Sequence, residues 1–269
     1  MTGTYGTGRA GEAGEARRMV LGGTPADGWD LAGLLLRVKD RLTGPPARPL
    51  VVASSNLDHL HHFGRGGAHA GVVERAEQDA DWLVLLDGMP LVWQARRLTG
   101  SPWERLTGAD LLPDLLSVAA SAGARVGFLG GQPETHRLLA ARLAEEWPEL
   151  VVAGYWAPSR AELTAPGGAA ELAGQVRLAA VDLLVVGLGK PRQEAWLADH
   201  AVTSGIRVGL AVGAAADFLA GVVDRAPDRW RNSGLEWLYR LVLEPRRLAR
   251  RYLLQGPRAA LRLLLASRG

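Results

Sequence analysis

The stretch DLLVVGLGKPRQE at residues 182–194 decides the fold class. Its apolar run at 183–186 is short and partly β-branched, which is typical of a buried strand. Two glycines then allow a tight turn, and Pro191 suits the first turn of a helix, where no N–H partner is needed. A strand that leads through a glycine turn into a helix indicates an α/β fold.

The same alternation continues toward both ends of the chain. Strands are predicted at 50–53, 82–86, 125–129, 150–153, 183–186 and 208–211. Helical periodicity is found near 28–42, 69–79, 88–99, 109–122, 133–146, 168–179, 191–204 and 213–220. This order predicts a mostly parallel sheet with flanking helices, in which ligands bind at the carboxyl ends of the strands.

The composition fits one large globular domain with an appendage. Of 269 residues, 48% are apolar and 22% are charged, so a sizeable core can form. The absence of cysteine excludes disulfides and cysteine-bound zinc. No apolar run reaches the ~18 residues of a membrane-spanning helix, and the N-terminus lacks the apolar segment of a signal peptide. We therefore expect a disordered tail at 1–18, an α/β domain that carries the site at 19–224, and a basic, amphipathic helical appendage at 225–269.

The C-terminal segment concentrates positive charge. From residue 225 on there are eleven arginines and three acidic residues, although the net charge of the chain is only +3. Arginine alternates with leucine, tryptophan and tyrosine in two or three expected helices, divided by Pro245 and by Gly256-Pro257. The pattern allows a packed helical subdomain, a membrane-surface helix or a nucleic-acid-binding arm. A nucleic-acid arm would carry a denser basic run with fewer leucines, so we expect a membrane surface and no nucleic acid.

Polar or glycine-rich segments follow the predicted strands. They are SSN (54–56), DG (87–88), GGQPE (130–134), GLGKPRQE (187–194) and GAAADF (213–218). GGQPE is either an ordinary tight turn or an anion site at a helix N-terminus, and its residues leave both interpretations open. The donors of GLGKPRQE favour ligand binding over a merely capped helix. Asp87 can act as a base in a partly desolvated cleft, but its position alone favours a cap for the next helix.

Two clusters raise the question of a metal site. Asp79 and Asp81 form a D-x-D string, but they precede their strand, at the end opposite the expected site, so a solvated turn is the favoured interpretation. Four histidines also lie close in sequence, namely His59, His61, His62 and His69. No carboxylate lies at a spacing that would complete a metal site with them. The sequence therefore predicts no metal and no other cofactor.

Nine blocks of the sequence, in this order, resemble the WecG/TagA/CpsF family, glycosyltransferase family 26. They are SSNLDHL (54–60), DGMPLVW (87–93), ERLTGADLLPDLL (104–116), FLGGQPE (128–134), the WPEL stretch that ends in VVAGY (147–155), VVGLGKPRQEAWL (185–197), AVGAAADFLAG (211–221), RAPDRW (225–230) and GLEWLYRLVLEPRRLARRY (234–252). A single block is weakly specific, whereas nine in register are highly specific.

The resemblance implies a Rossmann-like fold and an enzyme. It implies transfer of an N-acetylmannosamine-like sugar, with inversion and without a metal, from a UDP-sugar to a polyprenyl-diphosphate-linked sugar. The reaction belongs to the biosynthesis of cell-surface polysaccharides such as teichoic acids, at the cytoplasmic face of the membrane. A peripheral membrane location and homo-oligomerisation through the C-terminal region are further expectations.

The resemblance also implies roles for individual residues. Asp87 matches the general base of the family's DG motif, Arg105 matches the pocket arginine, and Gln193 matches the glutamine of a PKQE-like motif. Arginines near the C-terminus are implied to close over the site and hold phosphates. The glycines of GGQPE and the lysine of GLGKPRQE are also expected to bind substrate. The expected substrate-binding residues are therefore Ser54, Asn56, Gly130, Gly131, Lys190, Asp217, Arg240, Arg247 and Arg250.

Two other classes of function compete with a transferase. A non-catalytic nucleotide-binding module that recruits partners to a membrane would keep the glycine loops but lose the base or the pocket arginine. The presence of Asp87, Arg105 and Gln193 argues against it. A nucleic-acid-binding protein would show a strongly salt-dependent gel shift.

Overall fold

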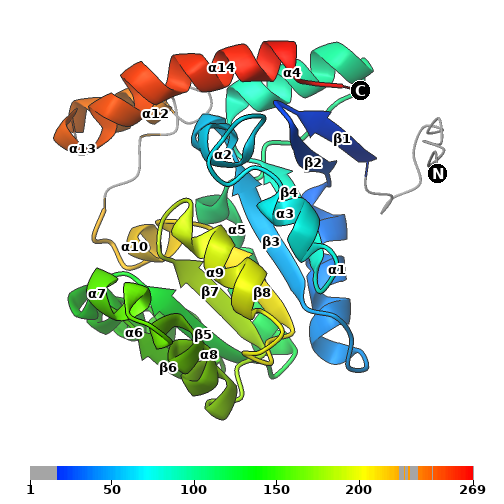
Figure 1. Cartoon of the computed structure of the whole chain (residues 1–269). Helices are drawn as coiled ribbons and strands as arrows, with labels where there is room; N and C mark the ends of the chain where they lie inside the picture. Colours follow the sequence, from blue (N-terminus) through cyan, green and yellow to red (C-terminus); the bar gives the residue numbers. More distant parts are fainter. Residues whose placement is uncertain (1–16, 224–226, 228–229, 231–235, 244, 269) are drawn as a thin grey trace.

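The computed structural model describes residues 17–223, 227, 230, 236–243 and 245–268. Its centre is an eight-stranded sheet in the order β1-β2-β4-β3-β8-β7-β5-β6 (Figure 1). The strands are β1 (Arg17–Leu21), β2 (Thr24–Gly28), β3 (Leu50–Ser55), β4 (Asp81–Leu86), β5 (Arg125–Gly130), β6 (Val151–Trp156), β7 (Leu183–Gly187) and β8 (Val208–Ala211). All neighbours pair in parallel except β1 and β2. The predicted α/β class is confirmed, and β3 to β8 are the six strands expected from the sequence.

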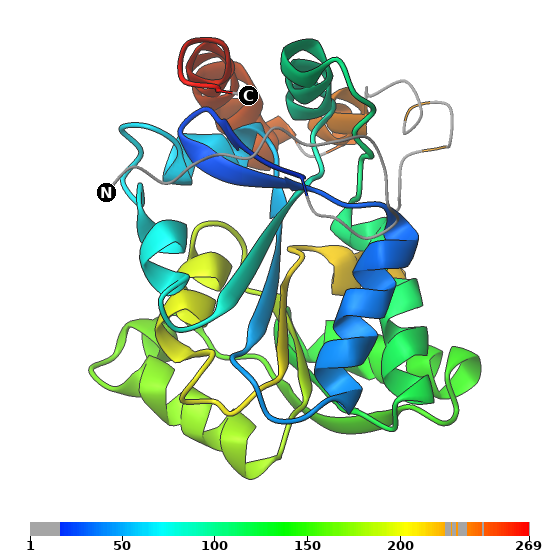
Figure 2. The same ribbon diagram turned by 90° about the vertical axis from the view of Figure 1, so that its right-hand side faces the viewer.

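Helices cover both faces of the sheet (Figure 2). They are α1 (Leu31–Thr43), α2 (Leu57–Phe63), α3 (Val72–Ala76), α4 (Met89–Thr99), α5 (Gly108–Ser121), α6 (Pro133–Glu146), α7 (Arg160–Thr164), α8 (Gly168–Leu178), α9 (Arg192–His200), α10 (Ala215–Leu219), α12 (Glu236–Leu243), α13 (Pro245–Ala249), the π-helical η1 (Arg250–Gln255) and α14 (Gly256–Leu265). One buried cluster joins α1, α5, α6 and α10 to the sheet, and a second joins α3, α8 and α9 to the other face.

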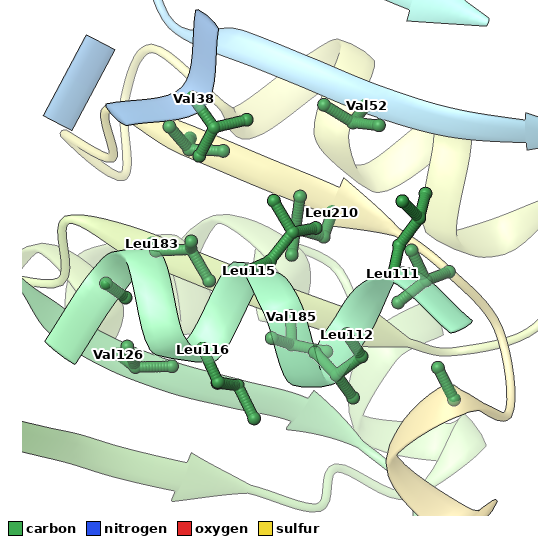
Figure 3. Close-up of a cluster of buried hydrophobic side chains, with 14 of the residues drawn as sticks. Val38, Val52, Leu111, Leu112, Leu115, Leu116, Val126, Leu183, Val185 and Leu210 are labelled. Atoms are coloured by element: carbon green, nitrogen blue, oxygen red, sulfur yellow. The ribbon is translucent and has the colours of Figure 1, made fainter. Parts of the chain in front are cut away.

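Helix α5 shows how periodicity produces this packing. Its residues Leu111, Leu112, Leu115 and Leu116 lie on one helical face and point toward the strands (Figure 3). All four are almost completely buried. Burial of a leucine side chain stabilises a fold by roughly 1.5–3 kcal/mol, so this face fixes α5 across the sheet.

The β1–β2 hairpin was not predicted from the sequence. Its second strand reads TPADG, a composition that is poor in strand-forming residues. The strand is held by tertiary contacts instead, because the Asp27 carboxylate accepts a hydrogen bond of 2.7 Å from the backbone N–H of Val84 in β4. The hairpin begins at Arg17, two residues inside the tail that was expected at 1–18, and residues 1–16 lie outside the described part.

Helix α14 lies beside α2 and α4 in both views, and η1 also contacts α2 (Figures 1 and 2). Pro245 begins α13 and Gly256 begins α14, as predicted, but η1 runs directly into α14. Ala259 and Leu263 of α14 are buried in a third cluster with side chains of α2, α4 and the hairpin. Among the described helices, none has the length and apolarity needed to cross a membrane.

Candidate active site

The carboxyl ends of β3 and β4 bring Asn56 and Asp87 together. These strands are in register up to the pair Ser55 and Leu86, so the next residue of each emerges at the same edge. The Asn56 side-chain amide donates a hydrogen bond of 3.1 Å to the Asp87 carboxylate. The other end of the Asn56 amide accepts from the backbone N–H of His59 and caps α2. Asp87 itself does not cap α4, whose first position follows Gly88 without a side-chain cap.

Arg105 is brought to the same edge by a backbone contact. The N–H of Leu106 donates to the carbonyl of Leu86 at 2.9 Å. Arg105 precedes Leu106 and Asp87 follows Leu86, so this bond brings the backbones of Arg105 and Asp87 close together. Arg105 is half-buried. Thr107 then caps α5 by accepting from the N–H of Asp110. These two contacts fix the chain directly after Arg105.

Three glycine turns, those after β5, β7 and β8, meet one another at the same edge of the sheet. At Gly130, with φ of 98°, a Cβ atom would lie 2.6 Å from the carbonyl carbon of Gly187, so the turns after β5 and β7 can approach this closely only without side chains. A Cβ at Gly187 would in turn lie 3.1 Å from the carbonyl oxygen of Gly213. A small cavity opens here, and Gly131 and Asp217 line it together with the three glycines.

His136 fixes the first of these turns. Its Nε2 donates to the Gly130 carbonyl at 2.7 Å, and its ring packs on Tyr155 with 5.2 Å between ring centroids. The Asp217 carboxylate lies nearby, because a Cβ at Gly131 would be 3.6 Å from His136 Nε2 and 3.8 Å from Asp217 Oδ1. Sequence analysis did not single out His136, although its position three residues after Pro133, within the first turns of α6, places it close to the loop.

The residues of the GLGKPRQE segment are more deeply buried than expected. The Lys190 ammonium group donates to the Ser54 carbonyl and to Glu194 Oε1, each at 2.6 Å. Gln193 and Glu194 have no exposed surface, and Gln193 Nε2 donates to Glu194 Oε1 at 3.2 Å. Glu194 was not predicted as a site residue, although the i,i+4 spacing from Lys190 on a helix start could have indicated the pair.

Glu194 is charged in this environment. Burial alone raises the pKa of its carboxyl group, but Lys190 and His59 more than offset burial and hold the pKa at about 2. His59 is also fully buried, and burial lowers the pKa of its imidazole even though Glu194 acts in the opposite direction. Its Nδ1 lies 3.9 Å from Glu194 Oε1. The cluster therefore consists of one carboxylate, one ammonium group and a neutral imidazole.

The C-terminal arginines are only partly described. Arg240 and Arg247 belong to α12 and α13, but their side chains lie outside the described part of the structure. Arg250 is exposed and, with Arg258 and Arg262, adds to the effect of burial in lowering the pKa of His61 on α2. The segment that carries Arg250 therefore faces α2, the helix that starts at Asn56.

Two arginines tie the C-terminal segment to α2. Arg262 donates to the Leu60 and His61 carbonyls at the end of α2, at 3.3 and 2.9 Å. Arg251 forms an ion pair of 3.2 Å with Asp58 in the first turn of the same helix. Basic groups at a helix C-terminus satisfy its last carbonyls and interact favourably with its dipole.

The clusters that resembled metal sites have other partners. Asp81 is paired with Arg41 at 2.6 Å and lies at the amino end of β4, away from the site. The four histidines mostly pack on one another and on Phe63. Within the described residues, no three acidic or histidine side chains converge as metal ligands.

A second, larger groove of about 420 Å³ runs along the edge of the sheet. It lies between the end of β6 and helices α7 and α8, and Tyr155, Trp156 and Glu171 line it. Because β6 and β4 are at opposite sides of the parallel sheet, this groove is far from Asp87.

One comparison with known proteins bears on this site. The family model described as "Glycosyl transferase WecG/TagA/CpsF family" matches residues 19–269, which is nearly the whole chain and includes all the candidate site residues.

Proposed function

Because the chain belongs to the WecG/TagA/CpsF family of glycosyltransferases, which act in cell-surface polysaccharide synthesis, we propose that it moves an N-acetylhexosamine-type sugar from a UDP-sugar to a polyprenyl-diphosphate-linked sugar. N-acetylmannosamine or a related sugar is the proposed donor group. The reaction is a single displacement with inversion. The acceptor hydroxyl oxygen forms a bond to the anomeric carbon while the bond from that carbon to the UDP oxygen breaks.

Asp87 is the general base in this proposal. It takes the proton of the acceptor hydroxyl, and the electron pair of the breaking bond leaves with UDP. The observation that carries the assignment is the hydrogen bond of 3.1 Å from the Asn56 amide to one Asp87 oxygen. An amide donor holds the carboxylate in one orientation, as proton transfer from a positioned hydroxyl requires.

The leaving diphosphate needs positive charge and N–H donors rather than a proton. Arg105, Arg240, Arg247 and Arg250 are the proposed sources of charge. Because these cations can balance the diphosphate, we propose that no metal takes part.

The nucleotide and the transferred sugar have separate proposed contacts. Gly130 and Gly131 offer backbone N–H groups to the diphosphate of the nucleotide. Asp217 is the proposed contact of the uracil ring. Gln193 Oε1 has no hydrogen-bond partner within the described protein, so it is the atom of that side chain that we assign to a substrate donor. Ser54 and Lys190 complete the proposed pocket.

The lipid-linked acceptor places the enzyme at a membrane surface. Large apolar side chains are exposed on the C-terminal helices, among them Leu254, Leu261 and Leu265, which are 64%, 57% and 75% exposed. Arg250 and Arg258 are exposed in the same segment. Exposed leucines beside arginines fit a helix that rests on anionic lipid headgroups, and we propose this as peripheral docking at the inner face of the cell membrane.

A donor screen tests the proposed reaction. UDP release is measured for a panel of UDP-sugars with a short-chain lipid-linked acceptor, with and without EDTA. We expect release with one N-acetylhexosamine donor, no loss in EDTA, and a strong decrease in Asp87→Asn. Binding of UDP without transfer from any donor would favour the non-catalytic module instead.

Vesicle binding tests the docking surface separately. Deletion of the C-terminal helices would also remove Ala259 and Leu263 from the core, so exposed positions are better targets. We expect Leu261→Glu/Leu265→Glu to sediment less with vesicles that contain anionic lipid, while Leu178→Glu, an exposed leucine on α8, binds like the unaltered protein. Equal binding of both variants would contradict docking through α14.

A further inference from the structure

The last residues of β3 are held from two sides. Ser55 lies on the β4 side, because its carbonyl accepts from the N–H groups of Asp87 and Gly88 at 2.9 and 3.2 Å. Successive backbone carbonyls of a strand point to opposite neighbours, so the carbonyl of Ser54 points toward β8. The β8 strand, however, ends at Ala211, which pairs with Ala53. The Ser54 carbonyl therefore has no strand partner on that side.

Lys190 takes the place of the missing strand partner. Its ammonium group reaches from the turn after β7, across the end of β8, and donates to the Ser54 carbonyl at 2.6 Å. Only 7% of the Lys190 side chain is exposed. A buried ammonium group is costly unless a negative charge accompanies it, because it has lost its hydration. Glu194, with no exposed surface, supplies that charge at 2.6 Å.

The buried ion pair of Lys190 and Glu194 is expected to add little to the stability of the fold. Replacing a buried ion pair by apolar residues of similar volume is often neutral or stabilising, since the desolvation of both charges offsets their attraction. Glu194 Oε2 and His59 Nδ1 also lack a hydrogen-bond partner within the described protein, which adds to the cost of burying this cluster. A role in placing the end of β3 accounts for the pair better than stabilisation does.

We propose that Glu194 is a positioning residue for the transfer reaction. It holds the Lys190 ammonium group on the Ser54 carbonyl, and this contact fixes the 54–56 segment from which the Asn56 amide orients Asp87. The proposal rests on the assignment of Asp87 as the base. It differs from that assignment because Glu194 acts through Lys190 and the end of β3, and touches no substrate.

The first test compares two glutamate-to-glutamine variants of the full chain. Glu194→Gln leaves the buried ammonium group without a counter-charge, and a base displaced by ~1 Å can cost about 100-fold in rate, so we expect kcat to fall about 10- to 100-fold. The affinity for UDP, measured by calorimetry, should change by less than about twofold because the nucleotide contacts remain. Glu171→Gln, on the exposed face of α8, should change neither quantity.

A second test asks whether Glu194 acts through Asp87. In the Asp87→Asn background, Glu194→Gln should lower the residual rate by less than about twofold, since the base that it positions is already absent. An equal fold loss in both backgrounds would overturn the proposal, and so would an unchanged kcat in Glu194→Gln. A loss of UDP affinity as large as the loss of kcat would assign Glu194 to substrate binding instead.

A variant without buried charge guards against misfolding. Lys190→Met/Glu194→Leu replaces the pair by apolar residues of similar volume, which buried ion pairs often tolerate. We expect it to fold and to lose kcat as Glu194→Gln does, because the Ser54 carbonyl has again lost its donor. Full activity of this variant would overturn the proposal. A wild-type protein that releases no UDP from any donor would refute the proposed function, which is a different outcome.

Discussion

The two ends of β4 carry aspartates in opposite environments. Asp81, at the amino end, lies within 4 Å of three guanidinium groups, those of Arg41 at 2.6 Å, Arg37 at 3.4 Å and Arg48 at 3.9 Å. Asp87, just past the carboxyl end, is held by the amide of Asn56 at 3.1 Å. The guanidinium groups tie Asp81 to neighbouring segments as ion pairs, whereas the amide of Asn56 holds Asp87 in one orientation at the edge where ligands bind in a parallel sheet. The same residue type thus forms a network of ion pairs at one end and, in the proposed function, the general base at the other.

An acidic motif indicates a functional site only when its position in the sheet is also known. Asp79 and Asp81 form a string that metal-dependent transferases use, yet Asp81 anchors arginines of α1 and of the loop before β3. Asp87 has a less distinctive sequence environment, but it follows β4 at the same edge of the sheet as the glycine turns after β5, β7 and β8. In a parallel sheet this edge is where ligands bind.

Exchange of the aspartate at the active end should have the largest effect. Asp87→Asn keeps the volume of the side chain but removes the base, so we expect kcat to fall about 10²–10⁴-fold. The thermal transition should stay near that of the unaltered protein. Near-normal transfer by a folded Asp87→Asn protein would disprove the base assignment.

The amide that orients Asp87 should have the next largest effect. Asn56→Ser retains a good helix cap for α2 but loses the N–H donor to Asp87, so we expect stability to change by less than ~1 kcal/mol. We expect kcat to fall about tenfold, in line with the loss of one orienting contact. Steady-state kinetics and urea unfolding separate the two quantities. A stability loss without a rate loss would restrict Asn56 to capping.

At the amino end of β4, exchange of Asp81 should affect stability rather than the rate of transfer. Asp81→Asn leaves the nearly buried Arg41 with a neutral partner, so we expect the free energy of unfolding to fall by about 1–2 kcal/mol. The value of kcat per folded molecule should not change, because Asp81 lies at the opposite end of the strand from Asp87. A large decrease in kcat would show that the two ends are coupled.

Exchange of Asp27, which is hydrogen-bonded to the middle of β4, should change only the pH dependence of stability. Burial raises the pKa of this carboxyl group to about 6, although Arg18 and the Val84 N–H act in the opposite direction and Glu77 adds to the rise. Between the unfolded value of 3.8 and about 6, the folded protein binds a proton that the unfolded chain has lost, so this group makes stability fall as pH rises.

Asp27→Asn removes this titration and keeps an acceptor for the Val84 N–H. Relative to the unaltered protein, the variant should gain about 1–2 kcal/mol more at pH 8 than at pH 5, as expected for one unit of pKa. Urea unfolding at the two pH values measures the difference. A gain that is the same at both values would mean that Asp27 does not titrate in this range.

Local pattern was sufficient for the repeating elements. The six short apolar runs became β3 to β8 because fully buried parallel strands are continuously apolar, and that signal needs no partner to be recognised. The helix start at Pro133 and the helix boundaries at Pro245 and Gly256 followed from the backbone limits of proline and glycine. The chemistry of the site was predicted through the motif blocks rather than from any residue alone.

What only the tertiary structure decided depends on contacts between distant segments. The strand at TPADG exists because β4 lies beside it, and one face of α14 is buried because Leu60 of α2 and Leu91 of α4 pack in the same cluster. The burial of Lys190 and Glu194 follows from the early end of β8, a feature that no spacing within 187–194 contains. The sequence by itself determined the parallel sheet, the glycine turns and the position of Asp87. Only the folded sheet decided which aspartate is paired with guanidinium groups and which is held by an amide, because such pairing depends on neighbours that are remote in sequence.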